Sequence, residues 1–209
     1  MYKKKGKNMF KDIIKFFQKK KTEQNFIEYV NTSMDAARKI YVTTITSQTA
    51  ETIDKIITFW NNVDNAEGIE SLKREPIRIY INSTGGDFNA MLTILDAIKL
   101  SKTPVYTINI GTAYKEAFFV YLAGHKRLSY PHASFAYERD LRHIDEDNEN
   151  PMKNFYEKQL VELKDILLEK TKITDNEYNK HLKSIWYITT DEAYKLSICN
   201  QIQHLGINE

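Results

Sequence analysis

The chain has 209 residues, of which 42% are hydrophobic and 28% charged, a composition that suits one soluble domain with a sizeable core. Its single cysteine, Cys199, excludes an internal disulfide framework, and its five histidines show no zinc-like spacing, so we expect neither a metal site nor a cofactor. No apolar run approaches the roughly 18 residues that span a membrane, which favours a cytoplasmic location.

The first 21 residues differ in charge from the rest of the chain. They hold nine lysines and one aspartate, or +9 − 1 = +8, so residues 22–209 carry +2 − 8 = −6. Phe10, Ile13, Ile14 and Phe17 recur at helical spacing among the lysines, which predicts a short basic amphipathic helix. Four interpretations stay open for this arm: a disordered tail, a transit-like leader, an arm docked on a neighbouring subunit, or a binder of nucleic acid or membrane. We divide the chain into this basic arm, 1–21, and a single domain, 22–209.

Hydrophobic periodicity predicts the elements of the domain up to Gly124. After a polar stretch at 22–37, a first strand is expected at 38–45, and Ser47 is the expected cap of a helix that ends near Asn61 and Asn62. A polar connection follows. The central stretch then predicts a strand at 78–81, a glycine turn at 82–86, a helix at 88–100, a strand at 105–110, a second glycine turn at 111–117 and a helix at 118–124. A strand, glycine turn and helix in repeated order indicate a layered α/β fold with its site at the strand ends.

The last third of the sequence predicts short strands and a long helix. Strands are expected at 126–129 and 134–137, and an acidic run occupies 139–149. Residues 151–172 have the period of a long helix, and its apolar stripe indicates a partner that covers it. The stripe consists of Met152, Phe155, Tyr156, Leu160, Leu163, Ile166 and Leu167.

The central motifs resemble those of the ClpP family, the proteolytic subunits of the Clp protease. The family's I-N-S-P-G-G is I-N-S-T-G-G at 81–86, and its G-x-A-A-S-M-G-A is G-T-A-Y-K-E-A-F at 111–118. The resemblance covers residues 38–203 and implies a crotonase-like fold, a repeated ββα spiral core with a projecting handle helix. It also implies a serine endopeptidase that forms rings.

All three positions of the family's catalytic triad are substituted. The nucleophile position is Lys115, the base position is Glu138, and the acid position is Ile185. Nucleophilic catalysis needs a hydroxyl or thiol, a base that takes its proton and a group that orients the base. We expect an ion pair between Lys115 and Glu138; the alternative is that both side chains point into solvent.

The resemblance also maps an oxyanion hole onto backbone N–H groups of Gly86 and Glu116, beside Gly85 in the turn. Backbone donors do not depend on the side chain, so such a pocket can survive the loss of the triad. Two departures count against it. Glu116 stands where the family has methionine and places a negative charge where an anion would bind, and Thr84 replaces the proline of the turn.

The sequence therefore predicts a catalytically inactive ClpP-like subunit with a structural or regulatory role. Its expected partners are further copies in a heptamer or tetradecamer, an active ClpP in a mixed ring, and an unfoldase of the AAA+ class. Two alternatives belong to other classes. One is a peptidase or crotonase-type enzyme that uses the retained oxyanion hole, and the other is a binder of nucleic acid or membrane through the lysine-rich arm.

Overall fold

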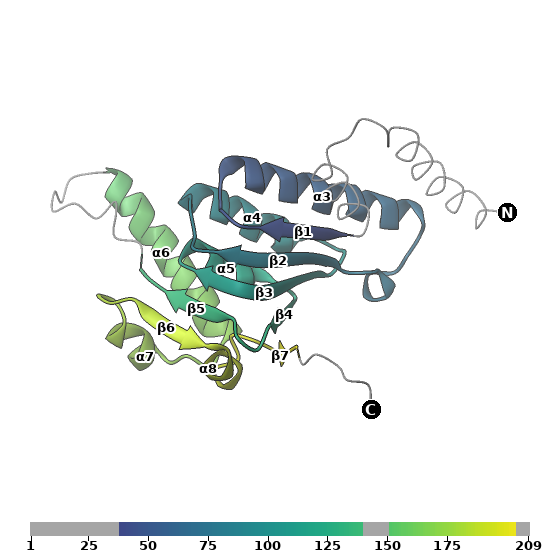
Figure 1. Ribbon diagram of the computed structural model, residues 1–209. Helices are drawn as coiled ribbons and strands as arrows, with labels where there is room; N and C mark the ends of the chain where they lie inside the picture. The colour runs from purple at the N-terminus through teal and green to yellow at the C-terminus, as the bar shows by residue number, and fades with distance from the viewer. Residues whose placement is uncertain (1–37, 140–150, 204–209) are drawn as a thin grey trace, which may run out of the picture.

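The computed structural model describes residues 38–139 and 151–203, with side chains from residue 154 onward in the second range. The described residues form an α/β structure with a single sheet, and α3, α4 and α5 lie together behind it in Figure 1. The basic arm at 1–21 and most of the acidic run lie outside the described residues, so the predictions made for them stay predictions.

Seven strands of the described chain form the sheet, in the order β1-β2-β3-β4-β7, while β5 pairs with β3, and β6 with β5. The pairs are parallel except β5 with β6, which is antiparallel. The strands are β1 (Lys39–Val42), β2 (Ile77–Ser83), β3 (Val105–Tyr114), β4 (Lys126–Ser129), β5 (Ser134–Tyr137), β6 (Trp186–Thr189) and β7 (Gln201–Ile202).

Helices connect the parallel strands and bury one face of the sheet. Ile79 and Ile81 of β2 are fully buried, as are Ile94 and Ile98 of α4, because their apolar faces meet in one core. The helices are α3 (Ser47–Ala66), the short 3-10 helix η1 (Ser71–Lys73), α4 (Phe88–Leu100), α5 (Glu116–Ala123), α6 (Pro151–Lys170), α7 (Asp175–Lys180) and α8 (Thr190–Lys195).

The strand β3 continues to Tyr114, through the first four of the residues at 111–117 for which the sequence predicts a second glycine turn, and the chain turns only at Lys115. Thr112–Tyr114 pair with β5, whereas the first half of β3 pairs with β4. Asn109 lies near the change of partner, where its Nδ2 donates to the Ser134 carbonyl at 2.8 Å and its Oδ1 accepts from the Gly111 N–H at 3.1 Å. A Cβ on Gly111 would lie 2.4 Å from Asn82 Oδ1, so this glycine is explained by close packing against the Asn82 side chain and not by a turn.

The handle helix α6 buries part of the stripe that the sequence assigns to a partner. Leu160, Leu163 and Leu167 are 7%, 3% and 1% exposed, because they pack into the chain's own core with α5. For these residues the prediction of an exposed stripe is wrong. Phe155 of the stripe and the nearby Val161 lie on the surface, at 51% and 58% exposure. The apolar area that is left for a partner is therefore smaller than predicted.

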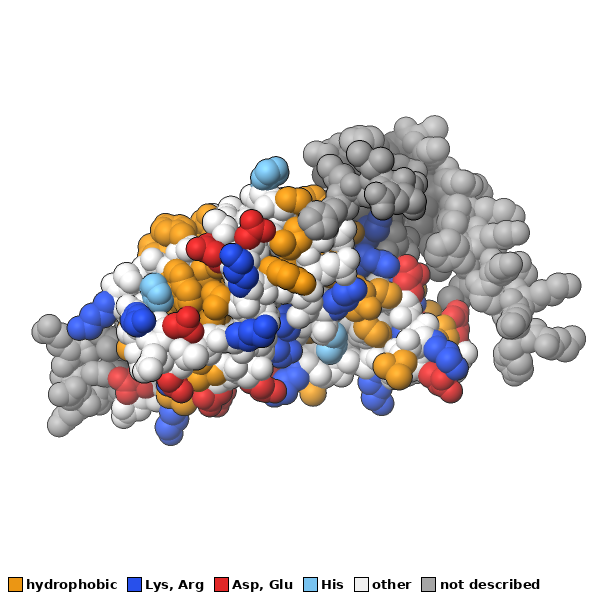
Figure 2. All heavy atoms as spheres, turned by 90° about the horizontal axis from the view of Figure 1, so that it is seen from below, with side chains coloured by type: hydrophobic (Ala, Val, Ile, Leu, Met, Phe, Trp, Pro, Cys, Tyr) orange, Lys and Arg blue, Asp and Glu red, His pale blue; other side chains and the backbone are white. Residues whose placement is uncertain are grey.

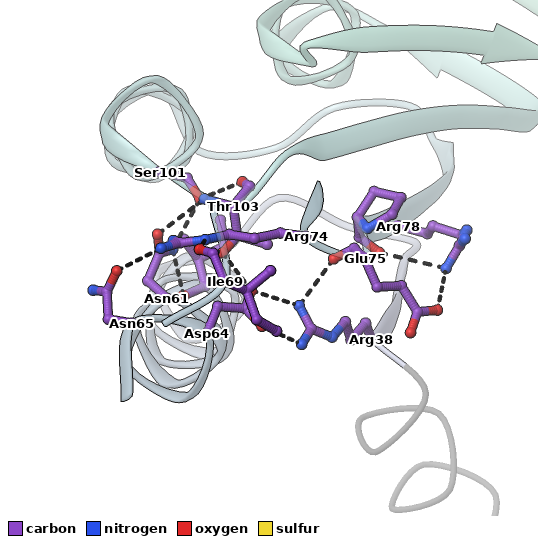
Figure 3. Close-up of polar contacts among 12 residues, drawn as sticks. Arg38, Asn61, Asp64, Asn65, Ile69, Arg74, Glu75, Arg78, Ser101 and Thr103 are labelled. Atoms are coloured by element: carbon purple, nitrogen blue, oxygen red, sulfur yellow. Dashed lines mark hydrogen bonds and ion pairs between the residues drawn. The ribbon is translucent and has the colours of Figure 1, made fainter. Parts of the chain in front are cut away.

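A buried polar network fixes the start of the described chain (Figure 3). Arg38 has a φ of 56°, and its two Nη atoms donate to the fully buried carboxylate of Asp64 at 2.8 and 2.6 Å. The Thr103 hydroxyl donates to the same carboxylate at 2.7 Å, and the guanidinium of Arg38 lies 4.1 Å from the ring centroid of Trp60. Because Asp64 anchors its last turns, α3 continues to residue 66 instead of ending near 61–62 as predicted.

Candidate active site

Lys115 forms a sharp turn between β3 and α5. Its φ of 52° and ψ of −119° are rare for residues with a side chain and cost on the order of 1–3 kcal/mol. Backbone hydrogen bonds hold this conformation: the Lys115 N–H donates to the Ala136 carbonyl at 2.9 Å, and the Lys115 carbonyl accepts from the Phe118 N–H at 3.1 Å. The site thus has a strained strand-turn-helix geometry with a lysine at its apex.

Glu138 lies opposite this turn. It follows β5, the strand that pairs with the end of β3, so the two candidate positions meet across this ladder. Lys115 Nζ is 2.8 Å from Glu138 Oε2 in an ion pair whose side chains are 49% and 33% exposed. The expected ion pair is present, and the alternative in which both side chains only face solvent is wrong. Neither partner offers the hydroxyl or thiol that an acyl-transfer nucleophile requires.

Ile185 comes to the same end of the sheet. It directly precedes β6, in which Trp186 pairs with Tyr137, so the antiparallel register brings Ile185 next to Glu138. Its side chain is 43% exposed and apolar. It therefore has no group that could orient a catalytic base by hydrogen bonding.

The paired-glycine turn binds a carboxylate of the chain itself. The Gly86 N–H donates to Glu116 Oε2 at 2.8 Å, and Glu116 is only 5% exposed. Gly85 has a φ of 112°, and a Cβ there would lie 2.3 Å from the same oxygen. A Cβ on Gly86 would lie 2.0 Å from the Ile45 carbonyl oxygen. The backbone donor predicted at Gly86 is present, but the Glu116 side chain occupies it.

A small cavity adjoins these groups. Its volume of about 20 Å³ has room for about one water molecule. Burial and a hydrogen bond with Tyr178 raise the pKa of Tyr137 at its wall, so this phenol stays neutral and is no general base near neutral pH. The apolar part of the wall comes from Phe88, Met91, Phe119, Leu160 and Leu163.

Within residues 38–139 and 151–203, no group of three histidine, cysteine, aspartate or glutamate side chains is placed to hold a metal ion. Over the same ranges, none of the helices has the length and apolar character needed to cross a membrane.

The model of the Clp protease family matches residues 21–205. The chain belongs to the Clp protease family. Two curated members of this family are ATP-dependent Clp protease proteolytic subunits 2 from Treponema. The Treponema denticola protein is 29% identical over 140 residues, which cover 64% of this chain and 70% of that protein. The Treponema pallidum protein is 44% identical over 71 residues, which cover 30% of this chain and 36% of that protein.

A solved member of the Clp protease family confirms the predicted fold. A ClpP1 mutant from Listeria monocytogenes superposes with a TM-score of 0.64, covering 84% of this chain and 96% of that chain, at 22% identity. The ClpP-like α/β architecture inferred from the sequence motifs is therefore correct.

The residues that the motif spacing assigns to the site lie together in the structure, but one of their contacts was not predicted. Lys115, Glu138, Ile185 and Gly86 converge as the motif spacing predicts. Glu116 was expected to contribute a backbone N–H and to repel anions, and the hydrogen bond that its carboxylate accepts from the Gly86 N–H was not foreseen. The signal in the sequence was an acidic residue directly after the mapped nucleophile position, together with a paired-glycine turn whose backbone N–H groups need acceptors.

Proposed function

We propose that this chain is a catalytically inactive subunit of a Clp-type proteolytic complex. The observation that carries the proposal is the 2.8 Å ion pair between Lys115 and Glu138, at the positions where the family resemblance places the nucleophile and its base. An ammonium paired with a carboxylate has no lone pair with which to attack a peptide carbonyl. The apolar Ile185 and the occupied Gly86 N–H support the same conclusion.

The test of inactivity is a peptidase assay on the purified chain with fluorogenic peptides and a serine-directed covalent probe. We expect no hydrolysis above buffer and no labelling of this chain. Lys115→Ala should leave this background unchanged. Peptide hydrolysis that Lys115→Ala reduces at least tenfold, or labelling of the wild-type chain by the probe, would contradict the proposal.

We further propose that the domain at 22–209 assembles into rings, as a homomeric heptamer or tetradecamer or together with an active ClpP, and that an AAA+ unfoldase docks on the assembly. Uncovered apolar side chains support a protein partner. The face of the molecule seen in Figure 2 shows apolar patches among charges of both signs. Exposed apolar residues of the described chain include Phe155 and Val161 of α6, Tyr187 of β6 and Tyr194 of α8.

Native mass spectrometry of the tagged chain, isolated from its own cells, tests this assembly. A ring of identical copies would indicate a self-sufficient chamber without peptidase chemistry. A ring that also contains an active ClpP would indicate a regulatory subunit, because the inactive chain would then dilute the active sites. A monomer as the only species would contradict the ring proposal.

A further inference from the structure

The contact between Gly86 and Glu116 has an implication that is separate from the proposed loss of the catalytic triad. We propose that the Gly85–Gly86 turn is a carboxylate-binding site and that its ligand is the chain's own Glu116. A hydrogen bond, burial and the backbone geometry of the turn hold this carboxylate, whether or not the assembled protein degrades substrates.

The backbone leaves the Gly86 N–H in need of an acceptor. Ile45 forms a parallel bridge with Gly86, in which the Ile45 N–H donates to the Gly85 carbonyl and the Asp87 N–H donates to the Ile45 carbonyl. In such a bridge the residue between the two bonds directs its own N–H to the opposite side. The Gly86 N–H therefore points away from Ile45, and Glu116 Oε2 accepts it at 2.8 Å.

The surroundings of Glu116 fit a charged carboxylate. Glu116 is the first residue of α5, where the helix dipole stabilises a negative charge. Although it is acidic, it is only 5% exposed, and buried carboxylates normally require such polar partners. Gly85 leaves the space that the oxygen needs, since a Cβ at this position would lie 2.3 Å from Oε2. The Gly86 N–H, the N-terminus of α5 and the space left by the absent Cβ of Gly85 together form a site for one carboxylate group.

Chemical rescue tests the site directly. Glu116→Ala removes a CH₂–COO⁻ fragment that corresponds to acetate. We expect the melting temperature of the purified full-length protein to fall by roughly 5 °C, since a buried charged hydrogen bond is lost. Sodium acetate should restore at least half of that loss, whereas sodium chloride at the same ionic strength should not. Wild-type protein should not respond to acetate, because its own carboxylate fills the site.

Glu162→Ala is the matched control, because Glu162 is an exposed residue of α6. We expect it to change the melting temperature little and to show no acetate response. A Glu116→Ala protein as stable as wild type would overturn the proposal, and so would an acetate effect of equal size in all three proteins. If Glu116→Ala does not fold, Glu116→Met fills a similar space without an oxygen that could accept from Gly86. Faster hydrogen exchange of the Gly86 amide in that variant would support the site, and unchanged exchange would contradict it.

Discussion

Asp64→Asn is expected to lower the free energy of unfolding by about 3–5 kcal/mol, the cost of breaking a buried ion pair. The Asp64 carboxylate is fully buried and accepts from both Nη atoms of Arg38 and from the Thr103 hydroxyl. Asparagine preserves the shape but offers a single acceptor oxygen and no charge, so the buried guanidinium loses its counter-charge. Chemical denaturation of wild type and variant at one protein concentration measures the difference.

Glu75→Gln is the control for this experiment. It removes an ion pair with Arg78 that spans 3.3 Å at the surface, where the two side chains are 63% and 31% exposed. Solvent screens such a pair, so we expect a loss below about 1 kcal/mol. Equal losses for Glu75→Gln and Asp64→Asn would show that the buried network contributes no more than a surface pair.

The stabilisation by Asp64 should also depend on pH. Burial alone would raise the pKa of Asp64, but hydrogen bonds from Arg38 and Thr103 and the charges of Arg38 and Arg74 outweigh it and hold this pKa below its usual range. Because the folded pKa lies below the unfolded value of about 3.9, the contribution is complete above that pH and is lost as the pH falls through the folded pKa. The stability difference between wild type and Asp64→Asn should be constant near neutral pH and shrink only below about pH 4. A difference that already shrinks between pH 7 and 5 would contradict this assignment.

Arg127→Met is expected to destabilise the protein by about 3 kcal/mol. The Arg127 side chain lies in the interior, where its Nε donates to the Ile198 carbonyl at 2.8 Å and its Nη2 donates to the Lys170 and Ser197 carbonyls at 2.9 and 3.0 Å. Methionine is of similar length but donates no hydrogen bond. In the variant, three carbonyl oxygens therefore lose their hydrogen-bond donor, and the C-terminal end of α6 loses a nearby positive charge. Thermal and chemical denaturation should both show the loss.

Lys126→Met provides the comparison at the neighbouring position of β4. Lys126 is half-buried, and its Nζ lies 5.8 Å from the ring centroid of Tyr106, a cation–π contact that contributes about 0.5–1 kcal/mol. We expect this variant to lose no more than that amount. If Lys126→Met and Arg127→Met lose the same small amount, the interior role assigned to Arg127 is wrong.

Local patterns in the sequence were sufficient for several elements. The predicted helix at 88–100 and the strands at 126–129 and 134–137 have the same bounds in the structure. These segments have a clear apolar period between turn-forming residues, and such a period depends only on neighbours along the chain. The second glycine turn was predicted to begin too early, because Gly111, inside β3, packs against Asn82 and the chain turns only at Lys115. That packing is a contact between two strands that no local pattern reports.

The sequence by itself determined the family and the order of the elements, since these depend on residue types and their spacing. Tertiary structure alone decided which groups became partners. Asp64 binds Arg38 across 26 positions, Glu116 reaches Gly86 across 30, and Arg127 donates to carbonyls as far as 71 positions away. Such contacts depend on how helices and strands pack in three dimensions. Packing is also what buries the leucines of α6 in the chain's own core, where the amphipathic pattern alone indicated a partner.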